Sequence, residues 1–319
     1  MKRDVTDCAA SRRWLRSIFG ALLAAGCFAC DDPLTDPAVV AGPRIAGARV
    51  SVAEDPDLAQ PSPGQAASIE WLVLAERDGE FSARVAWCYS APSVLGPPSC
   101  EGPAFAEQSA TGRFGEPLSL AFVVPAELTP GDAWLAWLGV CDGGEPPVFS
   151  APSSAFTCPN EEGLSGFYRG FAPEGTPNRN PSLADDLLAL DGTPWTARAA
   201  LPVRSPCRDA GLPAVRASVP ASISFELGGD DRDPLDLQPE TYAAHPRESL
   251  VYTHLGSHPG LDRAFSAIDY DAPAPSFAVP FELETAAPGD AGETFDFHLF
   301  VRDERGGVDW LRRQACLLP

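Results

Sequence analysis

The clearest fold signal lies in Phe297-His-Leu-Phe-Val-Arg-Asp303-Glu-Arg-Gly-Gly307-Val-Asp-Trp310, which Cys316 follows. A hydrophobic run leads into Asp303 and the Gly-Gly pair, and a second run carries the cysteine. Asp and Gly readily adopt the positive φ angles of tight hairpin turns. The same order occurs in Trp134-Leu-Ala-Trp-Leu-Gly-Val-Cys-Asp142-Gly-Gly144, which precedes Cys158. This repetition predicts a hairpin at the end of each of two similar domains.

Short apolar runs separated by turn residues occupy the rest of the chain. Residues 81–89 alternate in the way that is typical of a half-buried strand. Turn signals recur at intervals of roughly 8–12 residues, as in a β-sandwich. A long 3.6-residue period with caps is absent from the sequence, so we expect helix to be below about 10% of residues. The expected strands are 44–52, 67–74, 81–89, 118–124, 133–140, 187–190, 214–219, 223–227, 250–253, 277–283 and 295–301.

A duplicated sandwich accounts for both halves of the chain. The 319 residues leave room for two ordinary domains. We therefore predict an all-β protein with two tandem β-sandwich domains of one type. The first sandwich is expected at 43–158, a linker at 159–175 and the second sandwich at 176–319.

Composition limits the classes of partner. Hydrophobic residues make up 45% and charged residues 21%, which is ordinary for a globular chain. The net charge is -21, and Lys2 is the single lysine. This charge argues against nucleic acid as a partner and against electrostatic attraction to anionic lipid.

Residues 1–26 have the layout of a signal peptide. Basic residues precede the apolar stretch 18–26, which is shorter than the roughly 20 residues that span a bilayer. Leu23-Ala24-Ala25-Gly26-Cys27 resembles the bacterial lipobox, in which signal peptidase II cuts before a cysteine that carries lipid. Ala24 departs from the leucine that is usual at its place. The resemblance implies lipidation of Cys27, and Cys30 is a poorer acceptor.

Two other export signals stay open at this point. An ordinary secretory signal would be cut after a small residue and would leave Cys27 incidental. The stretch Ser11-Arg-Arg-Trp-Leu15 resembles a twin-arginine signal, from which Arg16 departs.

Lipidation would make the membrane the first partner of the chain. A processed cysteine with three acyl chains exceeds the two signals that stable anchoring needs. Residues 27–42 read as a flexible tether. We therefore expect a lipid-anchored protein of the bacterial cell envelope, at the periplasmic face of the outer membrane or at the cell surface.

Nine cysteines are present, and six of them fall in the expected sandwiches. An exported chain meets an oxidising compartment, where six cysteines suit three disulfides. Proximity favours Cys88–Cys100 and Cys141–Cys158, which leaves Cys207–Cys316. Six cysteines allow 15 pairings, so spacing alone does not fix them. Buried free thiols are the alternative, and zinc is disfavoured because no Cys-x-x-Cys occurs among these six cysteines.

Several motifs together resemble a family of predicted lipoproteins from myxobacteria and their high-GC relatives. The resemblance covers most of the mature chain and implies tandem immunoglobulin-like domains with no assigned activity. Tyr252-Thr-His254 departs from the Trp-centred strand expected after Glu248-Ser-Leu250. Besides the lipobox, the motifs are Asn178-Arg-Asn-Pro-Ser-Leu183, Leu190-Asp-Gly192, Pro239-Glu-Thr-Tyr242, Glu248-Ser-Leu250 and Val301-Arg-Asp-Glu-Arg-Gly-Gly-Val-Asp-Trp310.

Two groups of residues have the chemistry of metal ligands, but neither has a convincing pattern. His254, His258 and Asp262 are four residues apart, yet Gly256 and Pro259-Gly260 are incompatible with the helix that would align them. The acidic loop with Asp230, Asp231, Asp233 and Asp236 could hold Ca²⁺, although it lacks the EF-hand glycine and glutamate. We expect solvated loops in both places and predict no metal and no cofactor.

Catalytic signatures are equally weak. Gly256-Ser-His-Pro-Gly260 has two residues between the serine and the second glycine, so it is not a nucleophile elbow. Walker A and dinucleotide-binding patterns are missing from the sequence. Trp71, Trp87, Trp134 and Trp137 could form a carbohydrate platform, but alternate strand positions favour the core.

The sequence therefore favours a non-enzymatic, envelope-anchored lipoprotein that acts as a binding module or spacer of unknown ligand. The first alternative is a calcium-dependent adhesive or carbohydrate-binding surface module. The second is an envelope hydrolase whose site the sequence does not reveal. The sequence does not identify the protein or polysaccharide partner of the chain.

Overall fold

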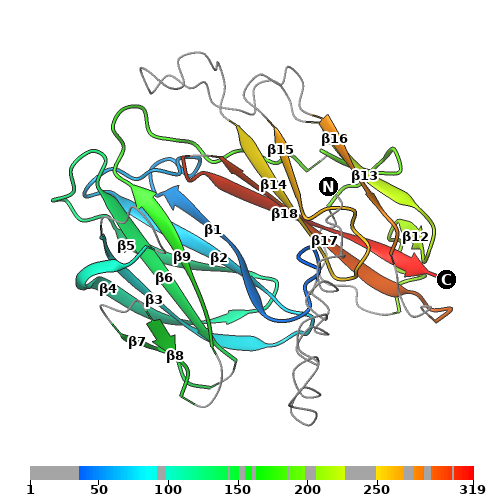
Figure 1. Ribbon diagram of the computed structural model, residues 1–319, viewed down its shortest axis with the longest axis horizontal. Helices are drawn as coiled ribbons and strands as arrows, with labels where there is room; N and C mark the ends of the chain where they lie inside the picture. Colours follow the sequence, from blue (N-terminus) through cyan, green and yellow to red (C-terminus); the bar gives the residue numbers. More distant parts are fainter. Residues whose placement is uncertain are drawn as a thin grey trace, which may run out of the picture. The chain divides into compact units, whose positions relative to one another are not determined.

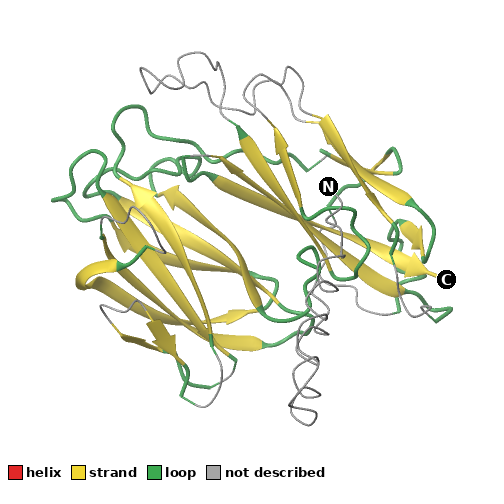
Figure 2. Ribbon diagram, in the orientation of Figure 1, coloured by secondary structure: helices red, strands yellow, loops and turns green. Residues whose placement is uncertain are grey.

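The computed structural model describes residues 36–319 apart from 92–97, 143, 151–154, 160–162, 186, 198–205, 227–248, 269–275, 284–288 and 304. Every secondary-structure element assigned in this part of the chain is a β-strand, so the expectation of an all-β fold is confirmed (Figure 2). In the same residues no helix is long and apolar enough to cross a membrane. The expected signal peptide, Cys27 and the acidic loop 230–236 lie outside the described residues.

The first sandwich consists of a three-stranded and a four-stranded antiparallel sheet (Figure 1). The first sheet has the order β1 (Arg44–Val52), β2 (Ala66–Leu74), β5 (Pro117–Val123). The second has the order β4 (Cys100–Arg113), β3 (Glu80–Ser90), β6 (Ala133–Cys141), β9 (Leu164–Phe171). A separate hairpin comprises β7 (Val148–Ser150) and β8 (Ala155–Thr157).

The second sandwich has a four-stranded and a five-stranded sheet. One sheet has the order β11 (Thr193–Pro194), β10 (Leu188–Leu190), β13 (Ala221–Glu226), β16 (Ser276–Phe281). The other has the order β12 (Ala214–Arg216), β18 (Val308–Leu318), β17 (Glu293–Asp303), β14 (Leu250–Gly256), β15 (Phe265–Ile268).

The two sandwiches share one strand order. The set β1-β2-β5 corresponds to β10-β13-β16, and β4-β3-β6-β9 corresponds to β15-β14-β17-β18. In both copies the fourth strand pairs with the third, whereas in a constant-type immunoglobulin domain it joins the opposite sheet. The second copy adds β11 at one edge and β12, which pairs in parallel with β18, at another. The architecture is therefore a tandem pair of immunoglobulin-like sandwiches.

The boundary between the two copies differs from the prediction. Residues 159–175, which we expected to be a linker, contain β9, and β9 pairs with β6 from Leu164 to Phe171. The Asp142-Gly-Gly144 turn leads into β7 and β8 rather than directly into the last strand. Cys158 therefore precedes the final strand of the first sandwich, whereas Cys316 lies on the final strand of the second.

Large aromatic side chains fill the core of each sandwich. In the first, Trp71, Trp87 and Trp134 are buried between the two sheets. In the second, Tyr252 and Phe297 belong to an equivalent cluster. Inward-facing residues alternate with outward-facing ones along each strand, as in other sandwiches. The tryptophans expected in the core are therefore found there, except Trp137, which faces outward in a separate buried cluster against which Phe149 and Phe156 pack.

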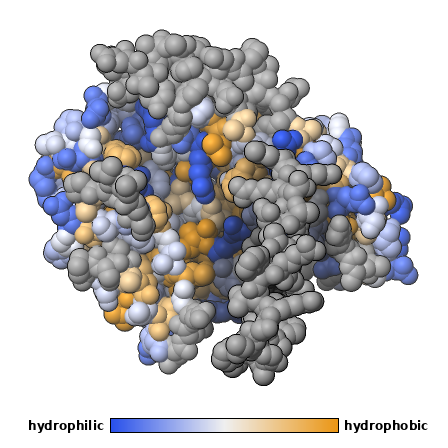
Figure 3. Space-filling model, in the orientation of Figure 1, coloured by the Kyte–Doolittle hydropathy of each residue, from blue (hydrophilic) through white to orange (hydrophobic). Residues whose placement is uncertain are grey.

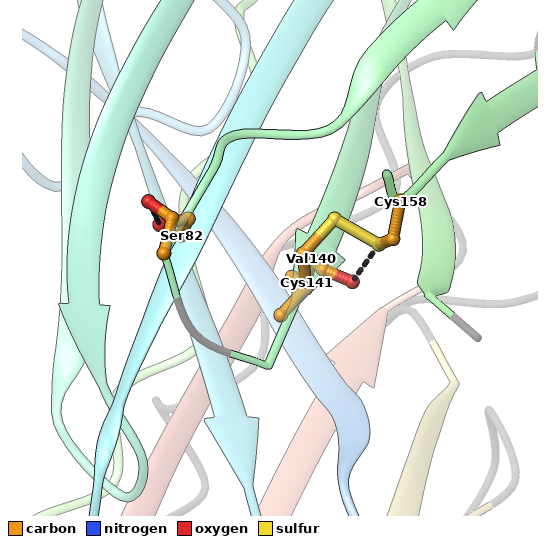
Figure 4. Close-up of a disulfide and its surroundings, with 5 residues drawn as sticks. Ser82, Val140, Cys141 and Cys158 are labelled. Atoms are coloured by element: carbon orange, nitrogen blue, oxygen red, sulfur yellow. Dashed lines mark hydrogen bonds between the residues drawn. A yellow bond between two sulfur atoms is a disulfide. The ribbon is translucent and has the colours of Figure 1, made fainter. Parts of the chain in front are cut away.

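The structure joins the six body cysteines in the three pairs that proximity favours. Cys88–Cys100 and Cys141–Cys158 close short loops in the first sandwich, with sequence separations of 12 and 17. Figure 4 shows Cys158 beside the Val140 carbonyl, 3.5 Å from Sγ to oxygen. Cys207–Cys316 has a separation of 109 and ties the start of the second sandwich to β18.

An apolar seam joins outward-facing residues of the two sandwiches. On the first side it contains Leu72 and Leu74 of β2, and on the second Phe300 of β17 and Leu255 of β14, with Trp310 of β18 packed against them. The Arg49 guanidinium lies 4.9 Å from the centre of the Trp310 ring, where its charge is attracted to the ring face. Its nitrogens also lie 2.6 Å from carboxylate oxygens of Glu70 and of Asp309.

Two asparagines connect the sandwiches beside this seam. The fully buried Asn178 accepts a backbone hydrogen bond from Ala59 at 2.8 Å and donates through Nδ2 to Asp303 at 2.8 Å. Asn180 donates to the Val50 carbonyl at 2.8 Å and accepts from the Val308 amide at 3.0 Å. Each asparagine therefore bonds to both sandwiches.

The Asp303 carboxylate organises the β17–β18 turn. Its Oδ1 atom accepts the backbone amides of Arg305 at 2.8 Å and Gly307 at 2.7 Å, while Oδ2 accepts Asn178. Burial raises the pKa of Asp303 to about 6, although these hydrogen bonds act in the opposite direction. The Tyr168 hydroxyl of β9 donates to the Gly306 carbonyl at 3.0 Å. The last strand of the first sandwich thus contacts the same turn.

We predict that loss of the long-range disulfide Cys207–Cys316 lowers the free energy of unfolding more than loss of a short-range disulfide does. On the chain-entropy model, a loop of about 100 residues contributes about 4.7 kcal/mol and one of about 15 residues about 3 kcal/mol. Equilibrium unfolding of the full chain should therefore show a larger loss for Cys207→Ser/Cys316→Ser than for the control Cys88→Ser/Cys100→Ser. An equal or smaller loss for the long-range pair would contradict the prediction.

We also predict that Gly307→Ala destabilises the protein. A Cβ at Gly307 would lie 2.1 Å from Asp303 Oδ2 and 2.7 Å from the Arg179 carbonyl oxygen, which cannot both move away. Overpacking of this kind costs about 1–3 kcal/mol. Gly289→Ala is the matched control, because its Cβ would have nothing within 4 Å. Thermal melting should separate the two variants, and equal melting temperatures would count against the packing described for the turn.

Candidate functional site

A cleft of about 770 Å³ opens where the apolar seam ends. Its floor is the outer face of β17 and β18, with Asp296, His298 and Arg312. One wall is the segment after β14, with Ser257 and His258. The facing wall consists of the β2–β3 and β4–β5 turns of the first sandwich, residues 75–79 and 113–116. Clefts of this size at domain boundaries are common ligand sites.

The register of β17 explains why the floor is polar. Phe300 pairs with Trp310, His298 with Arg312 and Asp296 with Gln314. Because side chains alternate across a strand, these residues share one face. The face is apolar where the first sandwich covers it and becomes polar toward the start of β17. Phe297 and Leu299 point to the opposite face and belong to the core.

The Asp296 carboxylate is held by two neighbours on β18. Its Oδ1 atom accepts Nε of Arg312 at 2.8 Å and Nε2 of Gln314 at 3.0 Å, and Nη2 of Arg312 lies at 2.7 Å. The backbone amide of Asp296 donates to Ser257 Oγ at 2.9 Å. The floor and one wall are therefore connected by direct hydrogen bonds.

Ser257, His258 and Glu293 form a line along the wall. Ser257 Oγ lies 2.9 Å from His258 Nδ1, and His258 Nε2 lies 3.4 Å from Glu293 Oε1. The order of hydroxyl, imidazole and carboxylate is that of a nucleophilic triad, in which further donors face the developing oxyanion. Here the nearby Asp296 amide binds Ser257 Oγ itself. The arrangement therefore connects the end of β14 to β17.

His298 lies at the inner end of the cleft and is 6% exposed. Its Nδ1 atom is buried without a hydrogen-bond partner among the described residues. Burial lowers the pKa of His298 to about 4; the Arg312 charge lowers it further and Asp296 acts in the opposite direction. The imidazole is consequently neutral at neutral pH.

The structure does not bring together the three residues that were considered as metal ligands. His254 is buried in the second sandwich, where Nε2 lies 3.0 Å from Ser266 Oγ, while His258 lies in the cleft wall and Asp262 is exposed. Among the described residues, no group of three or more His, Cys, Asp or Glu side chains could hold a metal ion. The acidic loop with Asp230 and Asp236 is outside that part of the chain.

Sequence reasoning missed most of the cleft. Glu293 and Arg312 come from positions far from Ser257 in sequence, and Asp296 falls in the expected strand 295–301. Only the period-two pattern of β17 could have placed Asp296 and His298 on one face. On the side of the molecule drawn in Figure 3, hydrophobic and hydrophilic residues lie close together.

Comparisons with known proteins leave the family open. No family model matches the chain, and no curated protein matches it. Three solved structures resemble it weakly, at 8–10% identity and over 85–86% of this chain. They are red sea bream transglutaminase (TM-score 0.23), Escherichia coli alpha-2-macroglobulin activated by porcine elastase (0.23) and dimeric latent PorU from Porphyromonas gingivalis (0.18). The match spans 32%, 22% and 24% of those chains, respectively.

We predict that His254 and His298 stay neutral down to about pH 5, since burial lowers the pKa of each to about 4 from an ordinary 6.5. Their contribution to stability is then present above pH 6.5 and is lost as the pH falls through 4. Between pH 6.5 and pH 4, each histidine lowers the free energy of unfolding by on the order of 1.4 kcal/mol for every pH unit of acidification. The ¹³Cε1 shifts of the histidines and melting temperatures across pH 4–7 measure both effects.

Asp303 has the opposite effect on the pH dependence of stability over part of this pH range. Its folded pKa of about 6 exceeds the ordinary 3.8, so its contribution to stability is lost as the pH rises through 6. Asp303→Asn should therefore make the loss of stability on acidification steeper. Titration of all histidines near pH 6.5 would contradict the burial described for His254 and His298.

Proposed function

We propose that the chain is a bacterial lipoprotein, anchored in the cell envelope through Cys27, that acts as a non-enzymatic binding and spacer module. The observation that carries the proposal is the pairing of all six body cysteines in three disulfides. Disulfides of this kind persist in oxidising compartments outside the cytoplasm. The lipobox-like Leu23 to Cys27 then supplies the anchor. The tether that we expected over residues 27–42 is shorter than predicted, because Ala38 and Val40 are buried and their backbone groups bond to Gly256.

The binding role is supported by the cleft, and the spacer role by the seam. Seam residues of both sandwiches pack together, and Asn178 and Asn180 bond across the same junction. Such a unit could present the cleft at a distance from the membrane. The assignment as a non-enzyme is supported by the Asp296 amide, which donates to Ser257 Oγ itself and not to the place of an oxyanion.

The proposed partners follow from the net charge of the chain and from the lipid anchor. A net charge of -21 disfavours nucleic acid and anionic lipid headgroups. The lipid on Cys27 would attach the protein to the outer membrane, at its periplasmic face or at the cell surface.

We predict that Cys27→Ser abolishes anchoring. The variant should move to the soluble fraction of lysed cells, because the cysteine thiol is the acceptor of the lipid. Cys30→Ser is the matched control and should remain in the membrane fraction like the wild type. Membrane fractionation with a mass measurement of the mature N-terminus tests both. A Cys27→Ser protein that stays membrane-bound and is processed like the wild type would overturn the proposal.

A further inference from the structure

We propose that the cleft binds a neutral saccharide, whose hydroxyl groups form hydrogen bonds with Asp296, His298 and Arg312. This inference rests on the proposed binding role and adds a site and a ligand class to it. Its support comes from unused hydrogen-bonding atoms, from the charge of the lining and from the rigidity of the floor.

Each of the three floor residues keeps hydrogen-bonding capacity. Asp296 accepts its side-chain bonds through Oδ1, and within the described structure Oδ2 has no partner. Arg312 uses Nε and Nη2 for Asp296, which leaves Nη1 as a donor. Buried Nδ1 of His298 also lacks a partner there. A buried polar atom without a partner costs free energy that a ligand hydroxyl could recover.

These atoms form a mixed set of donors and acceptors. An ionised carboxylate accepts, a guanidinium donates, and a neutral imidazole can do one of each. A hydroxyl group donates and accepts at the same oxygen, so neighbouring hydroxyls of a sugar can satisfy such a set together.

The charge of the lining disfavours anionic ligands. Five carboxylates face the cleft against three guanidiniums. Arg312 is already paired with Asp296, and Arg77 with Asp142. A phosphate or uronic acid would therefore meet net negative charge. A basic peptide would suit the rim, but it would bring positive charge against Arg312.

The floor is preorganised for binding. β17 is paired along its length with β18 and with β14 on its other side. The Ser257 and Asp296 hydrogen bonds fix the wall to this floor. Binding groups on paired strands lose little conformational freedom when a ligand is bound, which favours affinity.

The test is isothermal titration of the purified full chain in detergent. The probes are neutral tri- to hexasaccharides of glucose, mannose, galactose and N-acetylglucosamine, with an oligouronate and hexalysine as charged counterparts. We expect at least one neutral oligosaccharide to bind, and His298→Ala to weaken that binding about tenfold or more. His254→Ala is the matched control, because His254 is also buried and neutral but faces the core from the adjacent strand. It should leave the affinity within about twofold.

A second measurement covers the case in which His298→Ala fails to fold. In the wild-type chain, the ligand should shift the imidazole ¹⁵N signals of His298 and leave those of His254 in place. Absence of binding to every neutral oligosaccharide would overturn the inference. Preference for the oligouronate or hexalysine would do the same, and so would binding that His298→Ala leaves intact. None of these results bears on the fractionation of Cys27→Ser, so the anchoring proposal stands or fails separately.

Discussion

The junction between the two sandwiches depends on one carboxylate, that of Asp303. It accepts two amides of its own turn and the side chain of Asn178, whose backbone bonds to the first sandwich. A buried carboxylate is unfavourable unless hydrogen bonds compensate for the lost hydration. The turn, the connecting segment and the first sandwich must therefore be in place together. This explains why Asn178-Arg-Asn180 and Asp303-Glu-Arg-Gly-Gly307 act as one structural unit although they are distant in sequence.

The cleft is a geometric consequence of that junction. Phe300 and Trp310 are covered because the first sandwich is held against them, and the same sheet face continues past the covered area to His298 and Asp296. One strand, β17, thus contributes core residues on one face and both seam and cleft residues on the other. A shift of its register by one residue would exchange these faces, so the ten-residue pairing with β18 fixes core, seam and cleft at once.

Much of the fold was predictable from the sequence, because strands, turns and cysteine spacing are local signals. The period of two identified β3, a hydrophobic run identified β17, and Asp-Gly identified the turn after β10. β4 was missed because its outward side chains are mostly exposed and give little hydrophobic alternation. β9 was missed because its glycines and aromatic residues resemble a loop. Of the cleft, Ser257 and His258 were considered together, but Glu293 and Arg312 join them through tertiary pairing that no local pattern encodes.

The spacing of the disulfides has a consequence for the order in which the chain becomes oxidised. A chain that emerges with its N-terminus first brings out Cys88 and Cys100, and then Cys141 and Cys158, before Cys207 appears. Domains that emerge early tend to fold early, so those four thiols can already be paired. Cys207 must then wait for 109 further residues until Cys316 arrives, but it meets few competing thiols in the meantime. Vectorial emergence therefore reduces the 15 possible pairings to a short sequence of local choices, and the last bond closes only when the final strand has entered its sheet.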